Sequence, residues 1–275
     1  VAHHRAMQIS FFGGADTVTG SRHLVTWGDT RILLDCGMFQ GFKTFRERNW
    51  APVPDALRQA EAVVLSHAHL DHSGWLPALA KTGWRGRILA SAATCDLARV
   101  LLLDAAHLQE EDARRANRLG FSRHAKALPL YTRADALRAI ALLKPVALGQ
   151  AQRVGELDIT LYPAGHLLGA ASVSLTRRRE TLVFSGDLGR ADDLLMPPPQ
   201  RPPRADVLLV ESTYGNRWHP PEDVSARLGE LIVRTVQPDH APTPPPTPDP
   251  PRSPNAISLG RRAWIHPDDL GWQFT

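Results

Sequence analysis

Short apolar runs separated by turn residues recur in two blocks of the chain and predict β-strands. The predicted strands span residues 7–12, 23–27, 31–35, 62–65, 87–91, 159–162, 171–176, 181–185 and 207–210. The first five precede a segment with helical periodicity and the last four follow it. We therefore expect an α/β fold in which two sheets pack face to face, with helices outside them.

The segment between the β-rich blocks carries apolar residues at the period of 3.6 that is typical of an amphipathic helix. It predicts helices over 93–119 and 132–143, and a shorter helix is expected over 75–81. Thr132 can cap the second of these helices. The apolar side of the first helix is expected to comprise Leu97, Val100, Leu101, Ala105 and Leu108.

Proline divides the 275-residue chain into two unlike parts, since nine of its 23 prolines fall within residues 238–254. Sequence this rich in proline cannot form a packed core or continue a sheet. We expect residues 237–275 to be either a disordered tail or a segment that has left its reading frame. The organised part is predicted to be one domain over 7–215, with a helical insert at 93–145, followed by the beginning of a second domain at 216–236.

Charge and cysteine content set weaker limits on function. Lys and Arg number 32 against 28 Asp and Glu, and the resulting charge of +4 suits an anionic partner such as RNA without establishing one. Cys36 and Cys95 are too few for a disulfide framework, so a reducing, cytoplasmic location is expected. No run approaches the roughly 20 apolar residues of a membrane span, and no membrane partner is expected.

The strongest chemical signal is the segment 67–72, HAHLDH, which follows a predicted strand. Three imidazoles and a carboxylate this close together would be costly to bury without a cation, so a divalent metal is their expected partner. On an extended loop, His67 and His69 point the same way and can share one ion, whereas Asp71 and His72 can reach a second. The mixed nitrogen and oxygen donors favour zinc, with manganese or iron as alternatives.

Further ligands are expected at other strand ends, because four residues do not complete two metal sites. His166 and Asp187 each follow a predicted strand and are candidate ligands. Asp35 ends another strand, and its position suits a residue that orients a ligand or a water held by the metal.

Several longer motifs accompany the histidine cluster in a fixed order. They are 13–21 (GGADTVTGS), 34–41 (LDCGMFQG), 165–170 (GHLLGA), 185–190 (SGDLGR) and 211–215 (ESTYG). With the HAHLDH loop they resemble the metallo-β-lactamase superfamily, and in particular its β-CASP branch. That branch contains RNA-processing nucleases, including bacterial relatives of the endonuclease that processes mRNA 3′ ends. The resemblance covers residues 7–236 and includes the helical insert with Asp104, Glu110 and Glu111.

The resemblance implies a fold and a set of metal ligands. The fold is an αββα sandwich of two packed mixed sheets with outer helices. The implied ligands are His67, His69 and His166 for one zinc ion, Asp71 and His72 for a second zinc ion, and Asp187 as the bridge between the two.

The resemblance also implies the chemistry. Asp71, Asp35 and Glu211 are the implied catalytic residues. The implied reaction is hydrolysis of RNA phosphodiester bonds by a hydroxide shared between the two zinc ions, with RNA as the partner.

In the family that the motifs resemble, a β-CASP domain and a returning segment follow the ESTYG motif and supply a histidine general acid and a further zinc ligand. This sequence reaches a predicted helix over 222–236 and then the proline-rich tail. We therefore expect a truncated chain whose β-CASP domain is largely missing and whose second zinc site is incomplete. Two alternatives stay open: a catalytically inactive fragment that binds metal and RNA, and a single-domain hydrolase of small esters or thioesters. A homodimer also stays open.

Overall fold

The computed structural model describes most of the chain. The described residues are 6–120, 122, 124–217 and 223–236, with the pairs 257–258 and 264–265. Contacts within the chain divide it into two compact units, residues 1–215 and 216–275. We describe each unit by itself. Most of the predicted proline-rich tail lies outside the described residues.

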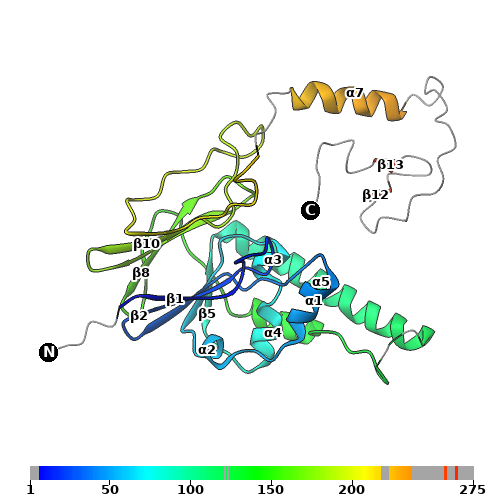
Figure 1. The fold of residues 1–275 in the computed structure, drawn as a ribbon, viewed down its shortest axis with the longest axis horizontal. Helices are drawn as coiled ribbons and strands as arrows, with labels where there is room; N and C mark the ends of the chain where they lie inside the picture. Colours follow the sequence, from blue (N-terminus) through cyan, green and yellow to red (C-terminus); the bar gives the residue numbers. More distant parts are fainter. Residues whose placement is uncertain are drawn as a thin grey trace. The chain divides into compact units, whose positions relative to one another are not determined.

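A six-stranded mixed sheet forms the first layer of the larger unit (Figure 1). In spatial order its strands are β1 (Gln8–Gly13), β2 (Arg22–Trp27), β3 (Thr30–Leu34), β4 (Ala62–Val64), β5 (Arg87–Ala90) and β6 (Leu143–Pro145). The first three strands pair antiparallel, and β3 through β6 pair parallel. The carboxyl ends of β3 and β4 therefore lie at the same edge of the sheet.

A five-stranded sheet forms the second layer. In spatial order its strands are β11 (Val207–Leu209), β10 (Glu180–Phe184), β9 (Ala171–Arg177), β8 (Leu157–Pro163) and β7 (Gln152–Val154). The pairs from β7 to β10 are antiparallel, whereas β10 and β11 are parallel. Because β9 separates β8 from β10, the strands β8, β10 and β11 all run in one direction.

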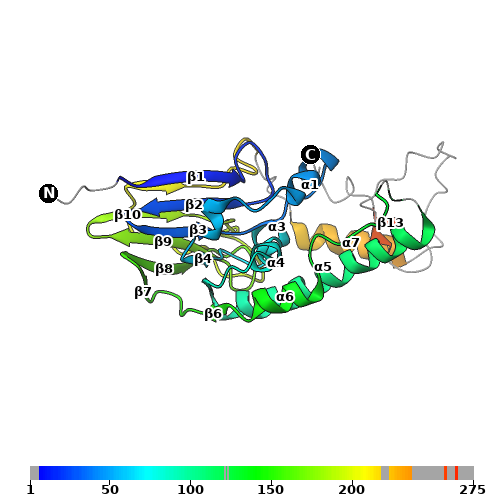
Figure 2. The same cartoon turned by 90° about the horizontal axis from the view of Figure 1, so that it is seen from below.

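The two sheets pack face to face over an apolar core (Figure 2). Val25, Ile32 and Val64 contribute from the six-stranded sheet, and Leu161 and Val173 from the five-stranded sheet. All five side chains are excluded from solvent. Alternate residues of the same strands face opposite ways, so the six-stranded sheet has a second apolar face to bury.

Helices cover that second face. In chain order the helices of the larger unit are α1 (Lys43–Glu47), the 3₁₀ helix η1 (Arg48–Trp50), α2 (Asp55–Arg58), α3 (Leu70–Ser73), α4 (Leu76–Lys81), α5 (Ala92–Leu119) and α6 (Arg133–Ile140). Leu79 of α4, Leu102 of α5 and Ala136 of α6 pack with Leu33 and Val63 of the sheet. The predicted α/β fold with two packed mixed sheets is confirmed. Among the described residues, the helices enter the apolar core on this side only.

Helix α5 buries only part of its predicted apolar side: Leu97 and Leu101 pack against the core and Ala105 is buried. Val100 and Leu108 are 66% and 54% exposed, so their predicted burial is wrong. The buried face consists mainly of small residues, including Ala98, Ala105 and Ala106. Small side chains let a helix approach its neighbours closely, and here α5 packs on α6 and β6.

The second predicted helix ends earlier than its sequence suggests. Helix α6 stops at Ile140, and Leu143, the last residue of the predicted helix, begins β6 instead. The amide of Ile88 donates to the carbonyl of Leu142, and Leu143 pairs with Ile88 in the ladder. Pairing with the sheet edge therefore outweighs continuation of the helix. The cap predicted at Thr132 is present, and Asp135 completes it as a capping box.

The smaller unit contains helix α7 (Val224–Val236) and the paired two-residue strands β12 (Ile257–Ser258) and β13 (Trp264–Ile265). Val224, Leu228, Leu231 and Ile232 recur at the spacing of one helical face. Over the described residues, none of the helices has the length and apolar character needed to cross a membrane.

Candidate metal centre

The chemistry-bearing residues follow strands whose carboxyl ends meet at one place. Asp35 follows β3, and the histidine cluster follows β4 in the same sheet. His166, Asp187 and Glu211 follow β8, β10 and β11 in the other sheet. The site is therefore assembled from both sheets.

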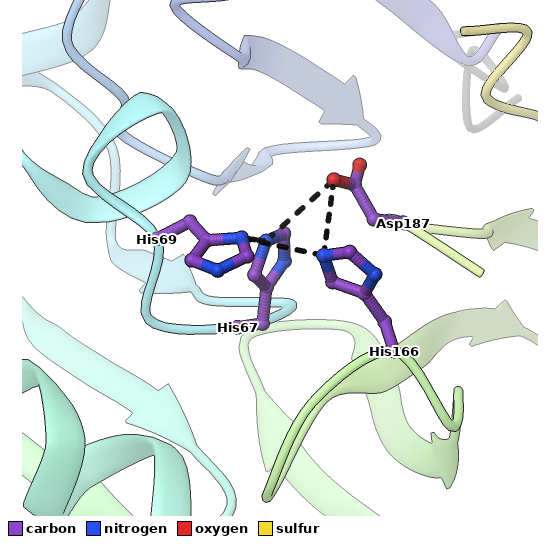
Figure 3. Close-up of side chains that lie close together, drawn as sticks. All are labelled: His67, His69, His166 and Asp187. Carbon is purple, nitrogen blue, oxygen red and sulfur yellow. Dashed lines mark hydrogen bonds and ion pairs between the residues drawn. The ribbon is translucent and has the colours of Figure 1, made fainter. Parts of the chain in front are cut away.

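Four of these side chains converge on one point (Figure 3). His67, His69, His166 and Asp187 each offer one ligand atom, and those atoms all lie within 4.8 Å of one another. His69 Nδ1 lies 3.0 Å from His67 Nε2 and 3.3 Å from His166 Nε2. Asp187 Oδ2 lies 3.7 Å from His67 Nε2 and 3.5 Å from His166 Nε2. Three imidazoles and one carboxylate oxygen thus form a set of donors of the kind that binds a tetrahedral metal.

The protonation of these histidines suits a metal. Burial and the neighbouring His72, His69 and His166 rings lower the pKa of His67 far below its ordinary value. The pKa of His69 is also lowered, first by burial and then by the His166 ring. The pKa of His166 is lowered by burial and then by the His72 ring. All three rings are therefore neutral at pH 7 and carry the lone pairs that a metal binds. The residues present fit a divalent cation.

A second group lies on the other side of Asp187. Asp187 Oδ1 lies 3.3 Å from His72 Nε2, and Asp71 Oδ2 lies 3.9 Å from the same nitrogen. Asp187 therefore presents one oxygen to each group, as a bridging ligand would. Asp71 and His72 lie on the short helix α3, which was not predicted from the sequence. The helical turn carries their side chains away from His67 and His69.

Negative charge accumulates around Asp187. Burial is the main cause that raises the pKa of Asp187 to about 6. His72 lowers this pKa, whereas the charges of Asp71, Asp35 and Glu211 raise it further. A cation between the two groups would offset this repulsion and favour the ionised carboxylate.

Asp35 is fully buried and is the hub of a hydrogen-bond network beneath the site. Its Oδ1 accepts from the Ser66 amide at 2.7 Å. Its Oδ2 accepts from His72 Nδ1 at 2.7 Å, Ser66 Oγ at 2.9 Å and Ser21 Oγ at 3.2 Å. The backbone of Asp35 has φ of 57°, a left-handed conformation that costs energy outside glycine. The network therefore holds the carboxylate in a strained but well-determined position and fixes the ring of His72.

Ser66 extends the same control to His67. The Ser66 hydroxyl lies 3.0 Å from His67 Nδ1, on the side of the ring away from the ligand atom Nε2. The roles of Ser66 and Ser21 were missed in the sequence. A hydroxyl directly before the histidine cluster was the only available signal, and serine is too common for that signal to be decisive.

A buried arginine supports the loop that follows Asp35. The Arg22 guanidinium donates to the Gly37 carbonyl at 2.6 Å and to Asn49 Oδ1 at 3.0 Å, and it lies over the Trp75 ring at 3.8 Å. Burial lowers the pKa of Arg22 to about 10. A side chain at Gly37 would come within 1.5 Å of the Asp71 carbonyl oxygen, so only glycine lets this loop pack against α3.

The loop that carries His166 is held by the start of α5. Gly169 O accepts hydrogen bonds from Ser91 Oγ at 2.7 Å and from Thr94 Oγ1 at 2.8 Å. Gly189 packs against the same loop, and its amide donates to Ala164 O. These contacts set the distance between the His166 and Asp187 segments.

Glu211 lines a cavity of about 650 Å³, and His72 and Asp187 of the candidate metal centre line the same cavity. Glu211 Oε2 accepts from the Thr213 amide at 3.1 Å and its Oε1 from the Leu188 amide at 3.4 Å. The structure thus brings every predicted site residue to one region, with Asp35 below the ligands and Glu211 at the cavity.

Comparison with known proteins decides the family. Residues 20–226 match the family model described as the metallo-beta-lactamase superfamily. The chain belongs to the metallo-β-lactamase superfamily. This confirms the family prediction, and the group of His67, His69, His166 and Asp187 is one that could hold a metal ion.

Three curated proteins are similar to the chain in sequence. Ribonuclease TTHA0252 of Thermus thermophilus is 41% identical over 231 residues, which cover 84% of this chain and 49% of that protein. Endoribonuclease ysh1 of Aspergillus fumigatus is 29% identical, covering 78% of this chain and 24% of that protein. Transcription termination factor FttA of Methanocaldococcus jannaschii is 30% identical, covering 76% and 32%. These relatives are consistent with the predicted β-CASP branch, and the chain spans about half the length of the first and a third or less of the others.

Proposed function

We propose that this metallo-β-lactamase chain carries the metal centre of a zinc-dependent ribonuclease that hydrolyses phosphodiester bonds in RNA. The supporting observation is the convergence of three neutral histidines and Asp187 within 4.8 Å, in a chain 41% identical to a ribonuclease over most of its own length. Two zinc ions are proposed, because Asp187 presents one oxygen to the His67 side and the other to His72.

The residues divide the work as follows. His67, His69 and His166 would hold one ion, Asp71 and His72 the second, and Asp187 would bridge them. When bound, such a pair lowers the pKa of water and neutralises charge on a phosphate undergoing in-line displacement.

The remaining side chains act on position and protons. Asp35 holds His72 through Nδ1, so that Nε2 faces Asp187. Asp71, beside His72, and Glu211, on the cavity wall, would orient an attacking water or receive its proton. The proposed hydrolysis does not require a covalent enzyme intermediate.

Metal analysis combined with cleavage of a 5′-labelled RNA tests the proposal. We expect about two zinc ions per chain and RNA cleavage that His69→Ala abolishes, with reduced zinc content. His107→Ala is the matched control, since His107 is an exposed histidine on α5 outside the site. Bound zinc with no cleavage by the unaltered chain would refute nuclease activity for this span and favour the alternative of an inactive metal-binding fragment.

A further inference from the structure

The cavity beside the metal group has a composition that the metal chemistry alone does not explain. Its volume of about 650 Å³ falls within the range of roughly 300–1,000 Å³ that is typical of small-molecule sites. His72 and Asp187 are among its lining residues, so a group bound next to them adjoins the candidate metal centre directly.

Part of the cavity lining is apolar and open to solvent. Phe11, Val18, Leu208 and Val210 make up this part, and each is between 53% and 67% exposed. Apolar side chains gathered in a concave surface are a common feature of sites that bury the flat or apolar part of a ligand.

The charges of the cavity disfavour a second phosphate. Asp16, Asp187 and Glu211 line it, whereas none of its described lining residues is Lys or Arg. A phosphodiester at the metal centre could be neutralised by bound cations, but an anionic group elsewhere in the cavity would meet carboxylates with no Lys or Arg among the described lining residues to offset them. The cavity therefore suits the uncharged part of a nucleotide.

Phe11 provides a firmly held aromatic surface. Its ring makes an edge contact with His23 at 5.3 Å, and His23 makes a similar contact with Phe184 at 5.4 Å. His23 is itself buried, and its Nε2 lies 3.2 Å from Ser21 Oγ in the Asp35 network. Phe11 is thus anchored from below while about half of it stays accessible to a base.

We infer that this cavity binds the nucleobase and ribose of the nucleotide adjoining the scissile phosphate, with Phe11 as the stacking surface. The inference rests on the proposed nuclease function and adds the part of the substrate that each wall contacts. Stacking on an aromatic ring tolerates any base, so the cavity contributes affinity rather than a strict sequence preference.

The test compares two probes on the full zinc-loaded chain by isothermal titration calorimetry: guanosine 5′-monophosphate and inorganic phosphate. Both probes offer a phosphate to the metal, but only the nucleotide can fill the cavity. We expect the nucleotide to bind about fivefold or more tightly than phosphate, and Phe11→Ala to remove that difference without changing zinc content or phosphate affinity. Phe42→Ala is the matched control, since Phe42 is 70% exposed and does not line the cavity.

Three results would overturn the inference. The two probes could bind equally well, or the preference for the nucleotide could survive Phe11→Ala. A lower melting temperature of Phe11→Ala with unchanged nucleotide affinity would instead show that Phe11 serves only to pack against His23. These outcomes are separate from RNA cleavage: a chain that cleaves RNA but does not prefer the nucleotide refutes only the cavity inference, and a chain that never cleaves refutes the nuclease.

Discussion

Asp35→Asn is the substitution that most directly tests how the site is supported. The two side chains have the same shape, and asparagine tolerates the left-handed φ of 57° at this position. The amide differs in one respect, because it replaces an acceptor oxygen with an NH₂ donor. Both oxygens of Asp35 accept hydrogen bonds, so the new donor must face the donors of either Ser66 or His72.

The size of the effect follows from the bond to His72. At 2.7 Å, His72 Nδ1 donates to a carboxylate, and a bond to a charged group contributes about 1.5–3 kcal/mol. At about 1.4 kcal/mol per tenfold change, its loss should weaken zinc binding by roughly 10–100-fold. Replacement of residues that orient metal ligands generally has an effect of the same size, about 10–100-fold.

Competition with a chromophoric zinc chelator at pH 7.5 measures this change, and far-UV circular dichroism of the metal-free variant verifies the fold. Asp55→Asn serves as the control, because Asp55 is an exposed carboxylate at the start of α2. A zinc affinity of Asp35→Asn within about twofold of the unaltered chain, with the fold intact, would refute the claim that Asp35 orients His72.

Three further predictions concern packing, pH and thiol reactivity. A methyl group in Gly189→Ala would lie 1.9 Å from Gly165 O, so we expect at least about tenfold weaker zinc binding in the same competition assay; unchanged affinity contradicts this. Burial lowers the pKa of His72, but Asp35 and then Asp187 and Asp71 outweigh it and raise the pKa to about 9. Protonated His72 therefore stabilises the metal-free fold, and this stabilisation is complete below about pH 6.5 and is lost as the pH rises toward 9. A melting temperature of the metal-free chain that does not fall between about pH 6.5 and 9 would disprove this. Burial raises the pKa of Cys36 to about 12 and that of Cys95 to about 11, so iodoacetamide at pH 8 should label both only after unfolding, as mass spectrometry would show.

The strands and the histidine cluster could be predicted because both leave strong local patterns. In β8, Leu157, Ile159 and Leu161 alternate with more exposed residues, as expected of a strand with one buried face. Likewise, the spacing of His67 and His69 predicts that their rings can share one metal ion. In the structure, His67 Nε2 and His69 Nδ1 lie 3.0 Å apart.

The features that were missed depend on tertiary contacts. The buried face of α5 was predicted from large aliphatic residues such as Val100, whereas close packing selected alanines such as Ala98. Ser21 and Ser66 act on Asp35 from 14 and 31 residues away in sequence, and no local pattern encodes those separations. The segment over Leu143–Pro145 became a strand because an edge of the sheet was available to it.

The assembly of the site from two sheets has a consequence for folding. His67 and His69 come from the segment after β4, whereas His166 and Asp187 follow strands of the other sheet. An ion bound by all four residues would link the two sheets. Its binding free energy would then add to the free energy with which the sheets pack together. An intermediate with only the first sheet formed would offer half a site. Capture of zinc during refolding should therefore report the moment at which the sheets join.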